Sequence, residues 1–282
     1  MKKIIFILVL SAATGTLSGQ QPIRLIIRGD DMGFSHSGNM AIVKAFREGI
    51  VRSVEVIVPS PWFPEAVELL KQNPGIDVGI HLAITSEWDK IKWRPLTDCP
   101  SLRDEDGYFF PMIYPNKNYP QRSVMENQWR LEDIEKEFRA QIELALKKIR
   151  GITHISGHMN STAFTPEVKA LARRLAQEYR IHIDPEDHQV IPMGYGGQAA
   201  GTSKQKIKSF IGVIHSLQPG NTYLFVDHPG LDNDELRAIS HIGYENVATD
   251  RQGVTDLFTS REVIQLIREK KIQLISYKDL KP

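Results

Sequence analysis

Residues 24–34 read Arg-Leu-Ile-Ile-Arg-Gly-Asp-Asp-Met-Gly-Phe, an apolar run that ends in two adjacent carboxylates. The run predicts a short β-strand, and in parallel α/β folds the functional side chains collect where strands end. Neighbouring side chains of a regular strand point to opposite faces, but a strand end that bends into a turn containing Gly33 allows Asp30 and Asp31 to face one pocket. We therefore expect one carboxylate to bind a metal ion while its neighbour takes a proton. The alternative for this segment alone is a solvated turn, because turns are often rich in aspartate.

Apolar runs and segments of helical period alternate along the rest of the chain. This alternation predicts a parallel sheet covered by helices. We expect about seven parallel strands in a single α/β domain over residues 21–282, arranged as a closed or nearly closed (β/α) barrel. Strands are expected at residues 23–27, 54–58, 78–84, 154–155, 181–183, 223–226 and 272–276, and helices at 40–46, 66–70, 131–149, 166–179, 204–217 and 260–270.

The segment from about residue 86 to residue 127 interrupts this alternation, since it has no sustained period of either kind. Loops of this length inside compact domains are usually functional, so we interpret it as a long insertion that forms a wall over the active face. Its aromatic side chains would be exposed if the segment were disordered, and each can either pack onto the barrel or stack on a sugar ring. They belong to Trp88, Trp93, Tyr108, Phe109, Phe110 and Tyr114.

The overall composition is that of an ordinary globular protein. The 282 residues are 41% hydrophobic and 24% charged, with a formal net charge of +1 and no block of like charge. Nothing therefore favours capture of nucleic acid or of an anionic membrane, and a small-molecule carbohydrate partner is easier to accommodate. Cys99 is the only cysteine, so no intramolecular disulfide can form. The composition leaves the oligomeric state open, a homodimer included.

The first twenty residues have the layout of a secretory signal peptide. A short positive segment is followed by a continuous apolar run over residues 4–10 and then by small and polar residues over 11–19. The apolar run is far shorter than the roughly 20 residues that span a bilayer, so we expect cleavage rather than stable membrane insertion, with an uncleaved anchor as the alternative. Export across the inner membrane to the periplasm is the localisation that this leader predicts.

Three further strand ends carry residues that can bind a metal or move a proton. His81 lies in the apolar run of residues 78–84, and an isolated histidine in such a run is more often a core residue than a ligand. His154 and His158 lie on either side of a strand end, and we favour His158 because it is nearer the carboxyl end. The fourth run ends in Asp227-His228 before a proline and a glycine. One Asp and two His are a sound ligand set for a divalent ion, with positions left for water and substrate.

These segments resemble the YdjC/ChbG–HpnK family of carbohydrate deacetylases, which are relatives of the polysaccharide deacetylases. The resemblance is carried by GDDMGF, GIHLAIT, THISGH, DHPG and ISYKDL, which begin at residues 29, 79, 153, 227 and 275. It implies a deformed (β/α) barrel and a divalent metal ion, Mg²⁺ or Zn²⁺. It also implies that Asp31, His81 and His158 bind the metal, that Asp30 is the base and that His228 is the acid.

The chain departs from the family pattern next to two of these motifs. Arg28-Gly29 stands where the family usually has Asn-Ala, and Ser156-Gly157 stands where it often has Asp-Ser. Asn160 lies in a position after His158 where further histidines are usual. The metal triad survives these changes, so we expect them to alter the surroundings of the ligands and hence substrate choice.

The resemblance implies hydrolysis of an N-acetyl group on an amino sugar or oligosaccharide. An O-acetyl esterase is an open alternative, because its chemistry is nearly the same. A glycosidase fits less well, since its two carboxylates usually stand about 5 Å or more apart on opposite sides of the scissile bond. A secreted sugar-binding protein without catalysis is the alternative from a different functional class.

Overall fold

The strand expected from residues 24–34 is the centre of the sheet. The computed structural model describes residues 21–198 and 200–280, so the predicted signal peptide lies outside the described residues. Strand β1 (Arg24–Met32) pairs with β6 along one edge, whereas its other edge pairs with β7 through its first residues and with β2 through its last. One strand thus organises both halves of the sheet.

All seven strands of the described chain run parallel, and their hydrogen-bonded order is β4-β3-β2-β1-β6-β5, with β7 beside β1. The order leaves β4 and β5 unpaired with each other, and we call this gap the seam. The sheet is therefore a curled, incompletely closed barrel, which confirms the predicted α/β class and deformed (β/α) barrel. The other strands are β2 (Ser53–Val56), β3 (Asp77–Leu82), β4 (Ile152–Gly157), β5 (Ile191–Met193), β6 (Thr222–Asp227) and β7 (Gln273–Ile275).

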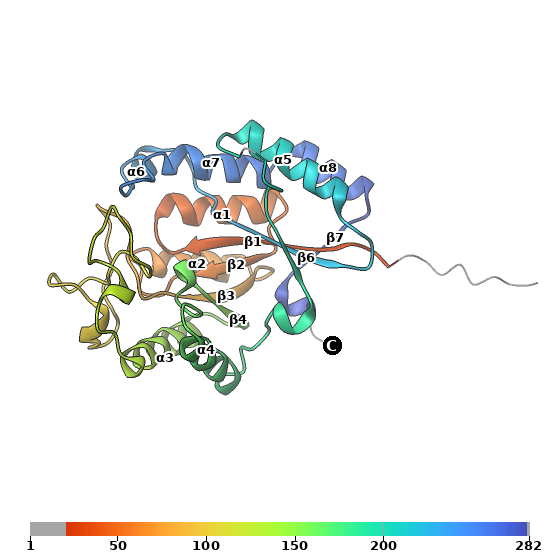
Figure 1. The fold of residues 1–282 in the computed structure, drawn as a ribbon. Coiled ribbons are helices and arrows are strands. Elements are labelled where there is room, and N and C mark those ends of the chain that lie inside the picture. The colour runs from red at the N-terminus through yellow and green to blue at the C-terminus, as the bar shows by residue number, and fades with distance from the viewer. Residues whose placement is uncertain (1–20, 199, 281–282) are drawn as a thin grey trace, which may run out of the picture.

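Helices cover the outside of this sheet in two groups. Figure 1 shows α1, α5, α7 and α8 on one side of the molecule and α3 and α4 on the other. The side-chain oxygens of Thr165 and Ser260 cap the first turns of α4 and α8. The helices are α1 (His36–Glu48), α2 (Phe63–Gln72), α3 (Leu131–Lys148), α4 (Pro166–Glu178), α5 (Ser203–Ser216), α6 (Asp234–Arg237), α7 (Val247–Phe258) and α8 (Arg261–Glu269).

Strand β1 separates two apolar clusters by the alternation of its side chains. Leu25 and Ile27 belong to the main core beneath the helices. Ile26 packs in a second cluster with Tyr277 and Leu280, which belong to a short 3-10 helix (Tyr277–Leu280) after β7. The amino-terminal half of the barrel interior is therefore filled, and functional groups are confined to the carboxyl ends of the strands.

One prediction for the second half of the chain was wrong, and two helices were missed. Residues 181–183 form no strand, because they cross the seam with a single backbone bond from Ile183 to the Thr153 carbonyl at 3.4 Å, and the fifth strand follows at residues 191–193. Helices α6 and α7 were not predicted at all.

The long segment between β3 and α3 holds only two short 3-10 helices (Pro100–Leu102 and Val124–Glu126). Figure 1 shows it in yellow beyond the carboxyl ends of the strands. Trp88, Trp93, Phe109 and Phe110 are buried, so these side chains pack rather than form an open sugar platform. Tyr114 is exposed.

Candidate active site

The backbone of Asp31 brings both aspartates of β1 to the same side. Asp31 has a φ of 67°, in the left-handed region that aspartate tolerates better than most residues, and the pairing of β1 with β2 shifts register between Gly29 and Met32. Because the alternation is broken here, His81 Nε2 lies 3.8 Å from Asp30 Oδ2 and 3.6 Å from Asp31 Oδ1.

His158 reaches the same place from β4. The strand ends at Gly157, where an added Cβ would lie 2.7 Å from the backbone nitrogen of Thr162, so only glycine allows this close turn. His158 opens a short 3-10 turn (His158–Asn160) whose next two residues have φ values of 50° and 67°. Its Nδ1 atom lies 3.2 Å from Asp31 Oδ1.

Asp31, His81 and His158 together have the features of a metal site. Each is buried and offers a ligand atom, and these atoms lie within 4.8 Å of one another. Asp31 Oδ1 is buried without a hydrogen-bond donor, although buried polar atoms are rarely left unpaired. A divalent cation would supply the missing partner, and a carboxylate with two imidazoles is a donor set that such ions accept.

A second carboxylate that we did not predict lies against His158. Glu87 Oε2 is 3.0 Å from His158 Nε2, and the Glu87 side chain is buried at the start of the long segment. Glu87 therefore holds the ring with Nδ1 toward Asp31, as carboxylates commonly do for metal-binding histidines.

Arg251 is a second residue that we did not predict. This buried side chain from α7 donates from Nη2 to Asp31 Oδ2 at 2.8 Å. Its guanidinium carbon lies 4.5 Å from the ring centroid of Phe34 and 5.2 Å from that of Trp88. By engaging Oδ2, Arg251 leaves Oδ1 of the same carboxylate facing the two histidines.

Asp30 is held in a different way from its neighbour. Arg28 donates from Nε and Nη2 to the two oxygens of Asp30 at 2.7 and 2.8 Å, and from Nη1 to the Tyr277 hydroxyl at 2.7 Å. The unusual arginine before the aspartate pair thus binds Asp30 in a bidentate fork.

His228 is the most open member of the group. It follows β6, and its Nε2 atom lies 3.9 Å from Asp31 Oδ2 while its side chain is 40% exposed. Asp227 Oδ1 lies 3.6 Å from His228 Nδ1, and Tyr195 donates its hydroxyl to Asp227 Oδ2. A ring anchored on one side and open on the other can exchange a proton with a bound molecule.

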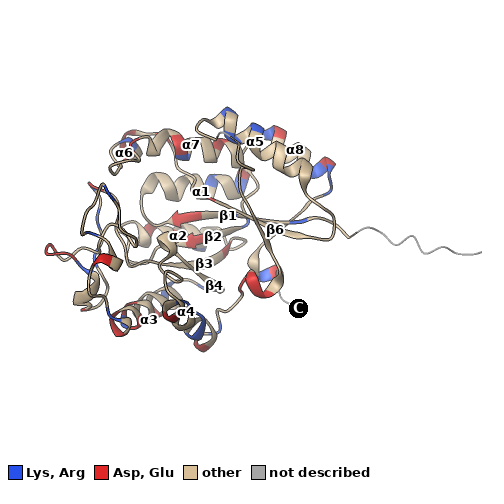
Figure 2. Cartoon of the chain, viewed as in Figure 1, with Lys and Arg blue, Asp and Glu red and all other residues tan. Residues whose placement is uncertain are grey.

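The charges of the site set the protonation of its histidines. Burial opposes the charged form of His158, but Glu87 and Asp31 outweigh burial and raise its pKa to about 10. For His81, burial prevails and lowers the pKa to about 4. Burial also opposes the charged form of His228, but Asp31, Asp227 and Asp30 together outweigh burial and raise its pKa. Figure 2 shows the acidic residues that end β1 and β2 in red inside the molecule. A divalent ion bound here would replace the positive charge that His158 otherwise carries.

Two other residues considered from the sequence lie apart from this group. His154 contacts Glu55 Oε1 through Nε2 at 2.5 Å and stacks on Tyr277 with ring centroids 3.7 Å apart. Cys99 is buried, and burial with the nearby Glu137 raises the pKa of its thiol to about 12. That thiol is no nucleophile at neutral pH.

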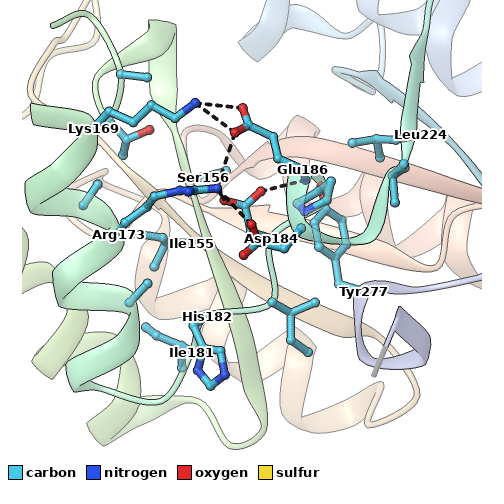
Figure 3. Close-up of a pocket in the computed structure, with 18 of the residues that line it drawn as sticks. Ile155, Ser156, Lys169, Arg173, Ile181, His182, Asp184, Glu186, Leu224 and Tyr277 are labelled. Atoms are coloured by element: carbon cyan, nitrogen blue, oxygen red, sulfur yellow. Dashed lines mark hydrogen bonds and ion pairs between the residues drawn. The ribbon is translucent and has the colours of Figure 1, made fainter. Parts of the chain in front are cut away.

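A cavity of about 400 Å³ opens at the seam, between α4 and the segment that leads to β5 (Figure 3). Arg28 and Ser156 line its wall, so the cavity adjoins the partners of Asp30 and His81. At its rim Lys169 pairs with Glu186 at 2.9 Å. The surroundings of the metal group are thus reached from the side of the barrel as well as from its carboxyl end.

The chain is similar in sequence, and in one case in fold, to several known proteins. The chain is 28% identical over 266 residues to carbohydrate deacetylase 1 of Listeria innocua serovar 6a. It is 29% identical over 271 residues to the carbohydrate deacetylase of Brevibacillus brevis. Both alignments cover 92% of this chain and 100% of the relative. A crystal structure from Enterococcus faecalis V583, of a protein named for cellobiose-phosphate cleavage, superposes with a TM-score of 0.73 at 25% identity, covering 93% of this chain and 100% of the other. The family model described as YdjC-like protein matches residues 24–269. This match spans most of the chain, which therefore belongs to the YdjC-like protein family.

Proposed function

We propose that the chain is a metal-dependent hydrolase that removes N-acetyl groups from an amino sugar or an oligosaccharide. The observation that carries the proposal is the buried, donor-free Oδ1 atom of Asp31 between the nitrogens of His81 and His158. The names of the two bacterial relatives supply the substrate class, since both are carbohydrate deacetylases.

Each of the five predicted site residues has a role in this proposal. Asp31, His81 and His158 hold the divalent ion, which polarises a carbonyl and makes water more acidic when it is bound. Asp30 accepts the proton of the attacking water, because Arg28 holds its carboxylate in place and leaves further lone pairs free. His228 donates a proton to the leaving amine from the open side of the group.

Exposed aromatic side chains near the strand ends supply the sugar contact. Trp62 is 37% exposed, and its backbone nitrogen donates to Gly33, two residues after Asp31. Tyr114 is 45% exposed, and its hydroxyl accepts from Asn160, two residues after His158. Both residues are thus bonded to the segments that follow two of the metal ligands, and in this proposal either ring stacks on a pyranose ring.

Acetate release tests the proposal. The protein is treated with a chelator, reloaded with Mg²⁺, Zn²⁺ or Co²⁺, and incubated with N-acetylated chitooligosaccharides and with matched O-acetylated sugars. We expect metal-dependent release from the N-acetylated set, loss of bound metal in Asp31→Ala, and loss of turnover with metal retained in Asp30→Asn. Release from the O-acetylated set alone would identify an esterase. No release with any metal, with sugar binding retained, would identify a binding protein.

We also propose that residues 1–20 direct export and that the mature protein is periplasmic. Among the described residues no helix is both long and apolar enough to cross a membrane. Amino-terminal sequencing of the protein from a periplasmic fraction should give a start between about residues 18 and 21, whereas a start at Met1 in the membrane fraction would contradict the proposal.

A further inference from the structure

His81 has a polar partner at its Nδ1 atom, distinct from the aspartates that face its Nε2 atom. Its Nδ1 atom lies 2.7 Å from Ser156 Oγ on the neighbouring strand β4. Ser156 Oγ in turn lies 2.5 Å from Oε2 of Glu55, which is fully buried on β2. Three adjacent strands thus contribute one group each to a chain that starts at the metal group and ends at a carboxylate.

The direction of the hydrogen bonds in this chain follows from the donor inventory. A serine hydroxyl has one hydrogen, and an ionised carboxylate can only accept. Burial alone would raise the pKa of Glu55, but His154 and Arg28 lower it to about 2, so Glu55 is a carboxylate at neutral pH. Ser156 therefore gives its hydrogen to Glu55 and must accept one from Nδ1 of His81. That arrangement leaves Nε2 of His81 without a proton and free to bind a cation.

We propose that Glu55, acting through Ser156, is a positioning residue for the metal site: it fixes the tautomer and the ring orientation of His81. Glu87 does the same for His158 by direct contact, whereas His81 is reached through an inserted hydroxyl. The inference rests on the metal site of the proposed function. It also gives Ser156, one of the unusual residues of this chain, a specific role.

The competing explanation is that Glu55 is purely structural. Its other oxygen accepts from His154 Nε2 at 2.5 Å, and Arg28 Nη1 lies 3.7 Å away, so the carboxylate is compensated without His81. A substitution of Ser156 distinguishes the two explanations, because removing its hydroxyl breaks the link to His81 and leaves the pairing of Glu55 with His154 in place.

The experiment measures Zn²⁺ affinity by competition with a chromogenic chelator and the melting temperature of the metal-free protein. Ser156→Ala should bind Zn²⁺ about 10- to 100-fold more weakly, as is typical when such an outer partner is lost. Ser156→Thr keeps the hydroxyl and should stay close to wild type. The double variant Ser156→Asp with Glu55→Gln moves the carboxylate next to His81 and should recover most of the affinity that Ser156→Ala loses.

Ser53→Ala is the matched control. Ser53 is a buried serine on the same strand as Glu55, and it donates to Asp77 rather than toward His81. Its Zn²⁺ affinity should be unchanged. An unchanged affinity in Ser156→Ala, or an equal loss in Ser53→Ala, would overturn the inference. A wild-type protein that binds no Zn²⁺ would overturn it together with the metal site, whereas one that binds Zn²⁺ but releases no acetate contradicts only the proposed activity.

Discussion

A single added methyl group at Gly79 should destabilise the barrel interior. An ideal Cβ on Gly79 would lie 2.5 and 2.6 Å from the two carboxylate oxygens of Glu55 and would also meet Nε2 of His154. The φ of Gly79 lies outside the left-handed region, so the backbone conformation does not oppose alanine there. Only the steric contacts of the added Cβ oppose it. Overpacking costs about 1–3 kcal/mol, and separating a buried ion pair costs about 3–5 kcal/mol. We expect Gly79→Ala to lower the free energy of unfolding by about 3 kcal/mol.

Gly212 provides a control with the opposite expected sign. It is exposed in the interior of α5, and an added Cβ meets nothing within 4 Å. Gly212→Ala should therefore raise the free energy of unfolding by about 0.5–1 kcal/mol, because glycine is a poor helix former. Urea denaturation followed by tryptophan fluorescence, with a chelator present so that metal binding does not contribute, measures both variants. Equal midpoints for Gly79→Ala and wild type would refute the reasoning about the interior.

Three further changes probe the site. Glu87→Gln should weaken Zn²⁺ binding by about 10- to 100-fold, because His158 loses the carboxylate that orients it; unchanged competition with a chelator would contradict this role. Arg251→Met should lower the free energy of unfolding of the metal-free protein by about 3 kcal/mol, the lower end of the range for a broken buried pair, because Asp31 loses the guanidinium at its Oδ2 atom but keeps His158 as a partner. Added Zn²⁺ should recover part of that loss, and equal losses with and without Zn²⁺ would argue against the pairing. Trp62→Ala should raise KM for an N-acetylated oligosaccharide by about 2- to 10-fold while Zn²⁺ affinity stays constant, and an unchanged KM would remove Trp62 from the sugar contact.

The parts of the site that follow strand ends could be predicted from the sequence. Asp31, His81 and His158 each terminate or closely follow an apolar run, and parallel strands bring their carboxyl ends to one edge. The alternation of runs and helical segments was strong enough to give the class of fold and six of the seven strands.

The partners of these residues could not be predicted in the same way. Arg251 lies 220 positions from Asp31, on helix α7, which the pattern of apolar residues did not reveal. Glu87 lies in a segment without periodicity, so nothing in its neighbourhood indicates that it turns inward to His158. Glu55 sits in an apolar run, and only the three-dimensional structure shows that it lies opposite Gly79 of β3 and that its carboxylate accepts from Ser156.

The strand predicted at residues 181–183 was wrong for a different reason. Ile181 and Ile183 have the β-branched side chains typical of a strand, but at the seam only one weak backbone bond joins this segment to β4. Strand propensity expresses how well side chains fit against a neighbouring strand rather than a backbone preference, and this segment does not form a ladder with β4.

The placement of Tyr277 has a consequence for how the chain folds. Its hydroxyl accepts from Arg28, 249 positions earlier, and its ring covers His154. Contacts between such distant positions are slow to form, because a long loop must close before they contribute stability. During synthesis from the amino end, the ribosome will have released strands β1 to β6 before the residue that completes the network around Asp30 emerges. The group around Asp30 should therefore be among the last parts of the molecule to become ordered, after the rest of the barrel is assembled.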